Sequence, residues 1–397
     1  MRKTEPMAAT SNRKHAIRFI VAMGIVSLFA DMTYEGAHSI IGPYLKDLGA
    51  SATQVGLIAG FGELIAATLR LVSGKLADKT RAYWTITFLG YALNLTVVPG
   101  LAFAQNWQGA ALFVVAERTG KGLRGPSKDV LLSGATKTVG HGWGFGLHAA
   151  MDQTGAVLGP LFMAAIVARE NTFGPAFLWL ALPAVVAFTS LFVARTMRPE
   201  EPEPPPDLAQ QRLPGFFWIY VVAAGLLACG FVDFALLAYH FQNAQLARPA
   251  AIPLYYAVAM GVAGLSALVF GRLFDRYGLR ILSVAIAVAL FALPLGFLGG
   301  PVAVVLSVAC WATGLGAQNS ILRSGIAQVI SMNKRGTAYG AFNAVYGLLW
   351  FAGSVVMGIL YDYSITALVV FGIAVQMIAG VMFLMLHGKV TDAAKAK

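Results

Sequence analysis

Residues 74–83 read Gly-Lys-Leu-Ala-Asp-Lys-Thr-Arg-Ala-Tyr, and residues 271–280 read Gly-Arg-Leu-Phe-Asp-Arg-Tyr-Gly-Leu-Arg. Both stretches follow the pattern Gly-x-Leu-x-Asp-Lys/Arg, and about half of the 397-residue chain separates them. Each is a short charged segment between long apolar runs. A charged segment that recurs once in each half of an apolar chain indicates a duplicated bundle of membrane-spanning helices.

The composition is that of an integral membrane protein. The chain is 58% hydrophobic and only 12% charged, with a mean hydropathy of +0.69. One soluble core could not hide so much apolar surface from water. The net charge of +11 comes from short basic clusters between apolar runs, so nucleic acid is not an expected partner. Cys229 and Cys310 lie within apolar segments, which predicts neither a disulfide framework nor a cysteine-based metal site.

Apolar stretches of about 20 residues, the length that crosses a hydrocarbon core of about 30 Å, predict the fold. We expect an all-α membrane protein with twelve transmembrane helices in two pseudo-symmetric six-helix bundles. The first span continues past Asp31 and has no small-residue cleavage site, so it is not expected to be a signal peptide. The predicted spans are 17–44, 53–76, 83–104, 108–128, 143–167, 175–196, 216–242, 252–272, 279–298, 301–323, 337–360 and 365–387.

The basic residues predict the orientation, because loops on the cytoplasmic side carry an excess of Lys and Arg. With the N-terminus inside, most of the 29 Lys and Arg residues fall on inside segments. The exceptions are Lys46, Arg169 and Arg248 outside, and Arg70 and Arg118 within spans. An even number of spans returns the C-terminus to the same side. We therefore expect a multi-pass protein of the cell (inner) membrane with both termini cytoplasmic.

A stretch rich in Pro and Glu, residues 198–214, divides the chain. Its prolines and charges cannot pack in lipid, which predicts a cytoplasmic linker. The expected domains are an N-terminal six-helix bundle over residues 1–196, the linker over 197–215, and a C-terminal bundle with a cytoplasmic tail over 216–397.

The predicted architecture resembles the major facilitator superfamily of secondary transporters. It shares two sets of six spans, cytoplasmic termini, a central linker, and a charged motif after the second and eighth spans. The superfamily's loop motif reads Gly-x-Leu-Ala-Asp-Arg/Lys-x-Gly-Arg/Lys-Arg/Lys. The second copy fits it closely, whereas the first carries Arg81 in place of the second glycine, so we expect its turn and its contacts to differ. The resemblance implies that these loops clamp one side of the molecule in one state of the cycle, although simple positive-inside anchors would look alike. The implied gating residues are Gly74, Asp78, Lys79, Arg81, Gly271, Asp275, Arg276, Gly278 and Arg280.

The fifth predicted span carries a glycine pattern similar to the antiporter motif of drug:proton exchangers. It consists of Gly146, Gly155, Gly159 and Pro160, and Met163 replaces the closing glycine of that motif. Small residues three and four positions apart allow helix backbones to approach closely, and a proline bends the helix. Ordinary helix packing would need the same residues, so the pattern leaves both antiport and packing open.

Ionisable residues near the middle of a span each cost roughly 2.5–3.5 kcal/mol to insert, so each needs a partner, a cavity or a neutral form. Asp31, Glu63, Arg118 and Asp152 share one such level in the first half. A static carboxylate–arginine network would stabilise helix packing. Alternatively, a carboxylate that alternates between apolar and cation-rich surroundings would load and release a proton. Asp31, Glu35 and Asp152 are the candidates for that role.

One face of the first span carries Asp31, Glu35 and His38 at successive helical turns. Asp233 and His240 repeat the seven-residue spacing of Asp31 and His38 in the seventh span, as expected if these spans are equivalent. Both histidines lie toward the outer ends of their spans, where surface histidines are ordinary. Asp233 joins the candidate cavity residues.

The second half has fewer charges at mid-depth and more amides and aromatic side chains. Such a mixture suits a cavity with one ionic wall and one hydrogen-bonding, largely apolar wall. The complete set of predicted proton-coupling and cavity residues is Asp31, Glu35, Glu63, Arg118, Lys121, His148, Asp152, Asp233, Gln318, Asn319 and Asn343.

These patterns predict a proton-coupled secondary transporter that works by alternating access and exports a small organic solute by antiport. A solute:proton symporter is one alternative, because the acidic face of the first span would serve either direction. An exporter of metal ions or metal chelates is another, although the chain lacks clustered cysteine or histidine ligands.

A membrane receptor or enzyme on the same fold is a remote alternative, since no nucleotide loop or nucleophile–base–acid arrangement occurs. We therefore expect no enzyme activity. The expected partners are a small-molecule substrate, protons and the lipid bilayer, with no nucleic acid, cofactor or bound metal. The resemblance implies a monomer.

Overall fold

The computed structural model describes residues 5–197, 213–330 and 335–395. Every regular element in these ranges is helical, namely fifteen α-helices and one 3-10 turn. A helix satisfies all of its backbone hydrogen bonds within one segment, which hydrocarbon surroundings require. Three spans are each interrupted once, so the fifteen helices make up twelve spans.

The first half contains six spans. α1 packs mainly against α5 and α7, while α4 packs against α2 and α3. The elements are α1 (Glu5–Asp47), α2 (Ala52–Thr80), α3 (Tyr83–Gly100), η1 (Leu101–Phe103), α4 (Trp107–Thr136), α5 (His141–Glu170), and the divided span α6 (Ala176–Trp179) with α7 (Ala181–Thr196).

The second half repeats this number of spans. α10 packs against α13, while α8 packs against α14 and α15. The elements are the divided span α8 (Gly215–Cys229) with α9 (Phe234–Asn243), α10 (Ala251–Tyr277), the divided span α11 (Arg280–Ala289) with α12 (Ala292–Phe297), α13 (Pro301–Val329), α14 (Arg335–Tyr363) and α15 (Ile365–Lys395).

Polar side chains fix several helix starts. The Ser51 hydroxyl accepts a hydrogen bond from the Gln54 backbone N–H, and the Gln54 side chain accepts one from the Ser51 N–H, which together form a capping box. Asn106 caps α4 in a similar way. Asp233 caps α9 by accepting the Ala235 N–H at 2.8 Å, directly after the break in the seventh span. This carboxylate therefore lies at mid-span where a new helix begins.

Eleven spans among the described residues are long and apolar enough to cross a membrane. The twelfth is α4, whose charged side chains lower its hydropathy and whose neighbours are α1, α2 and α3. Several helices also run beyond their predicted ends. α4 continues to Thr136 and α13 to Val329, whereas the predicted spans stop at 128 and 323.

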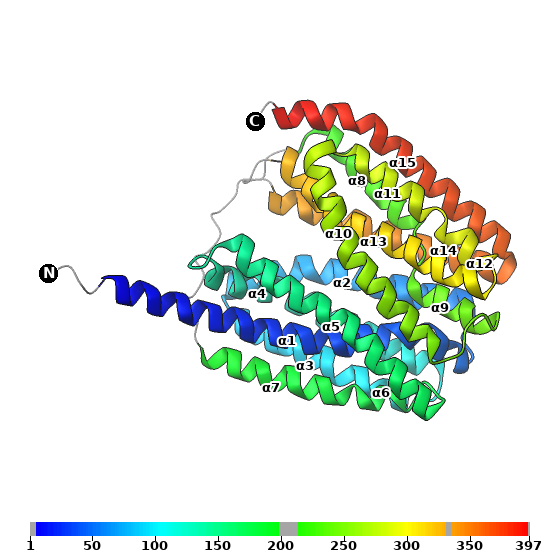
Figure 1. Cartoon of the computed structure of the whole chain (residues 1–397), viewed down its shortest axis with the longest axis horizontal. Helices are drawn as coiled ribbons and strands as arrows, with labels where there is room; N and C mark the ends of the chain where they lie inside the picture. Colours follow the sequence, from blue (N-terminus) through cyan, green and yellow to red (C-terminus); the bar gives the residue numbers. More distant parts are fainter. Residues whose placement is uncertain (1–4, 198–212, 331–334, 396–397) are drawn as a thin grey trace.

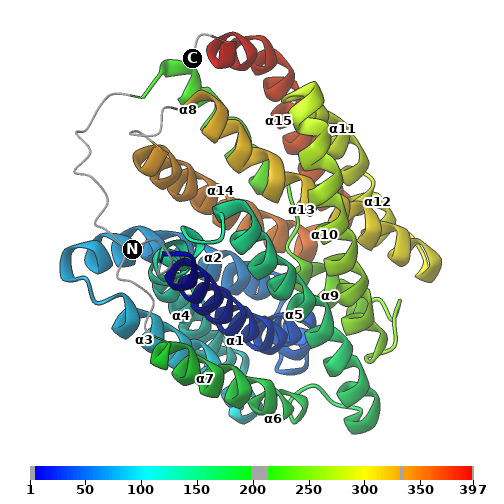
Figure 2. The same cartoon turned by 60° about the vertical axis from the view of Figure 1, so that its left-hand side comes forward.

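The two halves lie side by side as two groups of helices (Figure 2). Both termini are at one end of the molecule (Figure 1), which we call the termini side; the opposite end is the far side. Most of the predicted linker, residues 198–212, falls outside the described residues, as does the end of the predicted C-terminal tail, residues 396–397. The domain boundaries remain a prediction.

The halves are in close contact toward the far side. Gly42 of α1 lies directly on the backbone of Ala235 in α9, and Gly56 of α2 lies on the backbone of Ser354 in α14. A side chain at either glycine would collide with the opposite helix. Small residues at such crossings let helix backbones approach closely, which closes the far side.

The carboxylate of Asp362, near the end of α14, adds a polar contact on the far side. It accepts hydrogen bonds from the backbone N–H groups of Ala52 at 3.2 Å and Thr53 at 2.9 Å, and from the Thr53 hydroxyl at 2.6 Å. These N–H groups belong to the first two residues of α2 and have no hydrogen-bond partner within their own helix. The second half therefore caps a helix of the first, and the negative charge complements the positive end of the α2 dipole.

Candidate functional site

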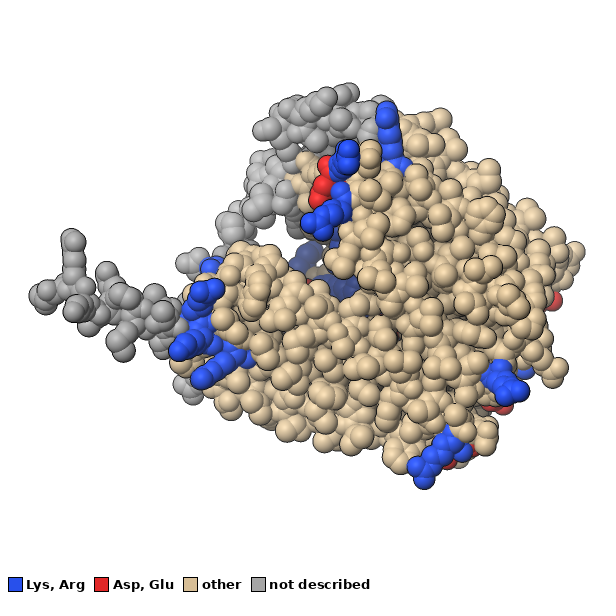
Figure 3. Space-filling view, viewed as in Figure 1, with Lys and Arg blue, Asp and Glu red and all other residues tan. Residues whose placement is uncertain are grey.

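A cavity of about 370 Å³ lies between the two halves. Helices α1, α2, α4 and α5 line it from the first half, and α9, α10, α13 and α14 line it from the second. The space-filling view shows a hollow toward the termini side with Lys and Arg atoms inside it (Figure 3). Every residue in the predicted proton-coupling and cavity set lines this cavity except His148. The cavity is closed toward the far side by the helix contacts described above.

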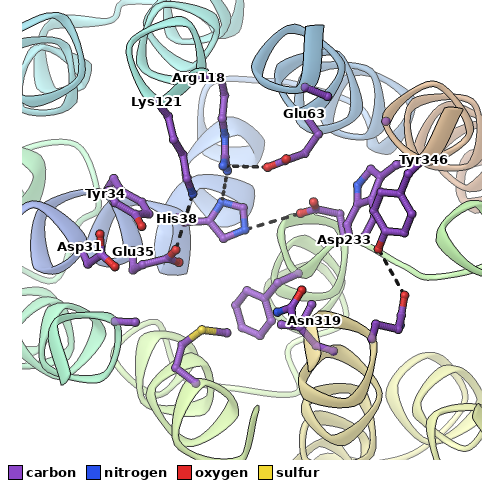
Figure 4. A pocket seen from close by; sticks show the side chains of 18 of the residues that line it. Asp31, Tyr34, Glu35, His38, Glu63, Arg118, Lys121, Asp233, Asn319 and Tyr346 are labelled. Carbon is purple, nitrogen blue, oxygen red and sulfur yellow. Dashed lines mark hydrogen bonds and ion pairs between the residues drawn. The ribbon is translucent and has the colours of Figure 1, made fainter. Parts of the chain in front are cut away.

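Arg118 is the most highly connected charge in the cavity. Its guanidinium contacts Glu63 of α2 at 2.7 Å and Glu117 of its own helix at 3.1 Å. It also lies 3.0 Å from Nδ1 of His38 in α1 (Figure 4). Because a guanidinium only donates, Nδ1 accepts this hydrogen bond and the ring proton belongs on Nε2. That nitrogen faces Asp233 at 3.8 Å, so a chain of polar contacts runs from α2 to α9 in the other half.

Glu35 makes a second connection between the halves. One carboxylate oxygen accepts a hydrogen bond of 2.6 Å from the Tyr256 hydroxyl of α10, and the other lies 3.9 Å from the Lys121 ammonium. The Lys121 ammonium also lies 4.1 Å from the centre of the Tyr34 ring, a cation–π distance. These contacts place Glu35 between a cation of its own half and a hydroxyl of the other.

Asp31 and Asp152 form a carboxyl pair at the interface of α1 and α5. Their side chains lie within interaction range of each other, and Asp31 is almost fully buried, with 4% of its surface exposed. Two carboxyl groups can share a hydrogen bond only if one of them carries a proton. Arg124 and Lys128 of α4 are the nearby cations. A proton shared by this pair would lie at the edge of the cavity, next to positive charge.

His148 lies one helical turn from Asp152 but is buried beside the cavity instead of lining it. Its Nε2 lies 3.2 Å from the Lys128 ammonium and 3.1 Å from the Ser27 hydroxyl. Because an ammonium only donates, Nε2 is the accepting nitrogen of the ring. Nδ1 then carries the proton, and it has no hydrogen-bond partner among the described residues.

The second half supplies a wall of amides and aromatic rings. The Tyr346 hydroxyl donates to the side-chain oxygen of Gln318 at 3.3 Å, and Asn319 projects into the same space (Figure 4). Phe234 packs between Tyr256 and Trp311, with ring centroids 4.4 and 5.6 Å away. This wall offers flat apolar surface and hydrogen-bonding groups but little charge.

The described residues contain no group of three or more His, Cys, Asp or Glu side chains placed to hold a metal ion. His38 and Glu35 both line the cavity, but their contacts are to Arg118, Asp233, Lys121 and Tyr256. The site consists of ion pairs and hydrogen bonds.

The model of the Major Facilitator Superfamily matches residues 23–354, most of the chain. The chain belongs to this superfamily. It is therefore a multi-pass membrane protein and a secondary transporter, not an enzyme, and its substrate is a small molecule. The fold predicted from the sequence, twelve helices in two six-helix bundles, is confirmed by this match and by the observed helices.

Relatives and solved structures agree with that assignment. The chain is 39% identical over 386 residues to an uncharacterised protein of Mycobacterium tuberculosis, covering 95% of this chain and 94% of the relative. It is 24% identical over 390 residues to an uncharacterised MFS-type transporter of Methanocaldococcus jannaschii, covering 94% and 96%. Among solved structures, a POT peptide transporter superimposes with a TM-score of 0.76 at 13% identity over 94% of this chain and 95% of that one. At such low identity the structural likeness shows the fold alone.

The two charged loops of this superfamily member differ in conformation. Arg81 and Gly278 occupy equivalent places after α2 and α10, and both have positive φ, 54° and 64°. Their ψ values are 17° and −153°, and only glycine adopts the second combination readily. In the first loop the Tyr83 hydroxyl donates to Asp78 at 3.2 Å. In the second, the Arg276 guanidinium lies over the ring of Tyr277, 5.4 Å from its centre.

The fifth-span glycines of this superfamily member have separate environments. Gly155 and Gly159 lie against the backbone of Leu28 and Met32 in α1, so tightly that an added Cβ would collide. Gly146 has open space where a Cβ would lie. Met163, in place of the motif's closing glycine, is fully buried and packs toward Gly36 of α1. Two of the three glycines therefore serve the α1–α5 contact.

Sequence reasoning left several cavity residues off the predicted set. His38 was assigned to the outer end of its span, yet α1 continues to Asp47 and places His38 inside the cavity. Its seven-residue spacing from Asp31 was the available signal. The equivalent His240 is buried elsewhere, 2.9 Å from the Tyr361 hydroxyl. No sequence pattern marks Arg323 as a cavity residue, because only the folded chain brings it to the cavity.

Proposed function

We propose that this transporter is proton-coupled, lies in the cell (inner) membrane with both termini in the cytoplasm, and exports a small organic solute by antiport. The basic residues favour this orientation, since the termini side carries most of the Lys and Arg outside the spans. In that orientation the cavity is open to the cytoplasm and closed to the outside. Such an inward-open state is the one that loads a solute for export.

The observation that carries proton coupling is the Asp31–Asp152 pair. A carboxyl group that shares a proton inside a membrane protein is a candidate proton carrier. Both residues border the cavity, so proton binding changes the charge that a solute meets there. Asp31 belongs to α1 and Asp152 to α5, two closely packed helices of the first half, and α9 and α10 of the second half contact this pair of helices. Movement of Arg124 or Lys128 toward the pair would stabilise the charged carboxylates and so favour proton release.

The connections between the halves supply a means of transmitting that change. Glu35 binds Tyr256, and His38 faces Asp233, so the helix that carries Asp31 contacts both α10 and α9. A shift of α1 after protonation alters these contacts, and a bistable interface amplifies small shifts. The proposed cycle needs only this coupling and the opening of the far side.

Reconstituted vesicles test the proposal. The purified protein is placed in liposomes with an entrapped pH-sensitive dye, and a panel of small organic solutes is added with and without an imposed pH gradient. We expect solute-dependent proton movement in the wild type. Antiport moves protons and solute in opposite directions, whereas symport moves both the same way, so the sign of the pH change decides between export and the uptake alternative.

Asp31→Asn and Asp152→Asn should retain the fold but lose proton movement, because the amide keeps the shape of the carboxyl and cannot release a proton. Glu170→Gln is the matched control, since it removes a carboxylate from the end of the same helix α5, away from the cavity. Proton-driven transport that survives in the Asp31→Asn/Asp152→Asn double variant would contradict the assignment of coupling to this pair.

A further inference from the structure

The charges that line the cavity do not balance locally. Arg118 pairs with Glu63, Lys121 faces Glu35, and Asp233 faces His38. Asp31 and Asp152 pair with each other. The two remaining charged residues of the lining are Arg70 and Arg323, and neither forms an ion pair or a side-chain hydrogen bond with another residue that the structure describes.

These two arginines come from opposite halves of the molecule. Arg70 belongs to α2 and Arg323 to α13, and both line the same cavity. They are within electrostatic reach of each other, and Arg70 also senses Glu63, which already pairs with Arg118. Like charges that face each other across a cleft repel, and the repulsion opposes closure.

One acidic residue near the arginines is not sufficient to compensate them. Asp129 of α4 is exposed and lies within electrostatic reach of both. A single carboxylate balances one guanidinium, so the immediate surroundings of Arg70 and Arg323 keep a positive charge, although the whole lining holds five carboxylates and four Lys and Arg side chains. An anion bound there would satisfy the unpaired donors, and a guanidinium binds the oxygens of a carboxylate or phosphate through two parallel hydrogen bonds.

The rest of the cavity complements the other end of such a ligand. Trp311, Tyr346 and Phe342 provide flat apolar surface, and Gln318, Asn319 and Asn343 provide hydrogen-bonding groups. Resting on the proposed transport function, we infer that Arg70 and Arg323 bind the anionic group of the cargo, and that the cargo is an organic anion with an aromatic or similarly apolar body.

This assignment gives the cargo a part in the conformational change. With the site empty, repulsion between Arg70 and Arg323 keeps the halves apart on the termini side. A bound anion neutralises that repulsion and contacts both halves at once. A ligand shifts a conformational equilibrium by its difference in affinity for the two states, and an anion between two approaching arginines binds the closed state more tightly.

Ligand binding without any gradient tests the inference separately from proton coupling. The full-length protein in detergent is heated with benzoate, phenyl phosphate, benzamide or benzylammonium, and the apparent melting temperature is recorded. A ligand that binds only the folded state raises this temperature. We expect benzoate or phenyl phosphate to stabilise the protein, and the stronger of the two identifies the anion class. Neutral benzamide and cationic benzylammonium, of nearly the same shape, should have little effect.

Variants then locate the site. Arg70→Gln and Arg323→Gln should each raise the anion concentration for half-maximal stabilisation about tenfold or more, as expected for loss of one charged hydrogen-bonding partner. Arg70→Lys and Arg323→Lys should retain part of the effect. Arg18→Gln removes the same charge from an exposed position of α1 outside the cavity lining and should behave like the wild type.

The inference is overturned if neither anion stabilises the wild type, if benzylammonium stabilises it more than the anions do, or if both glutamine variants bind anions like the wild type. Anion binding that depends on Arg70 and Arg323 supports it even if vesicles show no proton coupling, in which case only the proposed function fails. Conversely, proton-coupled transport of cations alone would support coupling and reject the anion site.

Discussion

Arg118 shows what a single side chain contributes to this cavity. Its guanidinium serves Glu63, Glu117 and His38 at the same time, and its residue surface is only 8% exposed. Five N–H donors in a fixed plane make this possible. Glu117 is equally buried and also accepts a hydrogen bond of 2.8 Å from the Asn94 side chain. Removal of the cation would leave the buried Glu117 carboxylate and the partly exposed Glu63 carboxylate without their counter-charge.

We predict that Arg118→Met lowers the stability of the protein by about 3 kcal/mol, because breaking a buried ion pair leaves an uncompensated charge. The stability of Arg118→Lys should lie between that of Arg118→Met and that of the wild type, since an ammonium cannot contact three partners in one plane. The apparent melting temperature in detergent measures both. Arg169→Met, which removes an exposed arginine at the end of α5, is the control. A melting temperature equal to that of the wild type for Arg118→Met would show that the network is not structural.

The sequence identifies a cavity residue where a charged side chain lies near the middle of an apolar span. The four residues of this kind line the cavity, namely Asp31, Glu63, Arg118 and Asp152. The identity of their partners was not predictable, because Arg118 meets His38 only after α1 and α4 pack together. The sequence places Arg70 within a span, but its position in α2 alone does not show that it lines the cavity.

At the scale of elements, the α1–α5 contact is the most extensive pairing of helices in the described residues. It carries the Asp31–Asp152 pair, so its geometry decides whether the two carboxyl groups meet. Gly155 and Gly159 allow the backbones to approach because they lack a Cβ. The same contact thus connects helix packing to the proposed proton site.

Alanine substitutions separate packing from other roles of the fifth-span glycines. Gly155→Ala and Gly159→Ala should each destabilise the protein by roughly 1–3 kcal/mol, the usual effect of overpacking, and should impair proton movement in vesicles by separating Asp31 from Asp152. Gly146→Ala should change neither, because its Cβ would enter open space. Impaired transport by Gly146→Ala at unchanged melting temperature would instead indicate a role of this glycine in the cycle.

The predicted spans correspond to observed helices, whereas the interruptions within three spans were not expected. Apolar length alone determines that a segment crosses the membrane, so it reports nothing about a local break. The break after Gly230 begins a new helix at Asp233, whose carboxylate caps it. The equivalent position Asp31 lies inside the unbroken α1. The repeat therefore predicts equivalent spans but not equivalent side-chain environments.

At the scale of the whole molecule, the structure corresponds to one of the two states of the proposed alternating-access cycle. The far side is closed by helix contacts and by the Asp362 cap on α2, while the cavity opens to the termini side (Figure 3). A second polar contact on the far side joins the Gln242 side chain to Asp47 at 2.7 Å. Alternating access requires all of these contacts to break when the far side opens.

The Asp362 cap is a contact that can be weakened without disturbing the packing of either half. Its carboxylate makes three hydrogen bonds to the start of α2, and it is the only charge in that contact. Replacement by asparagine keeps the size and removes the charge. A charge at a helix end contributes about 0.3–1 kcal/mol at an exposed site, and the weaker hydrogen bonds add to that. The equilibrium should therefore shift toward the far-side-open state by roughly tenfold, the effect of about 1.4 kcal/mol.

Distances between spin labels measure this shift. Labels at Lys46→Cys and Tyr363→Cys, in a background with Cys229→Ser and Cys310→Ser, report the separation of the two halves on the far side. Asp362→Asn should increase a population with longer distances, and Asp362→Glu should restore much of the closed distance, because a carboxylate is again available. Glu170→Gln, which removes a carboxylate at the end of α5 without an inter-half contact among the described residues, should leave the distribution unchanged. An unaltered distribution in Asp362→Asn would mean that apolar packing around Gly42 and Gly56 alone determines closure, and that the far side opens only when ligand or proton binding drives it.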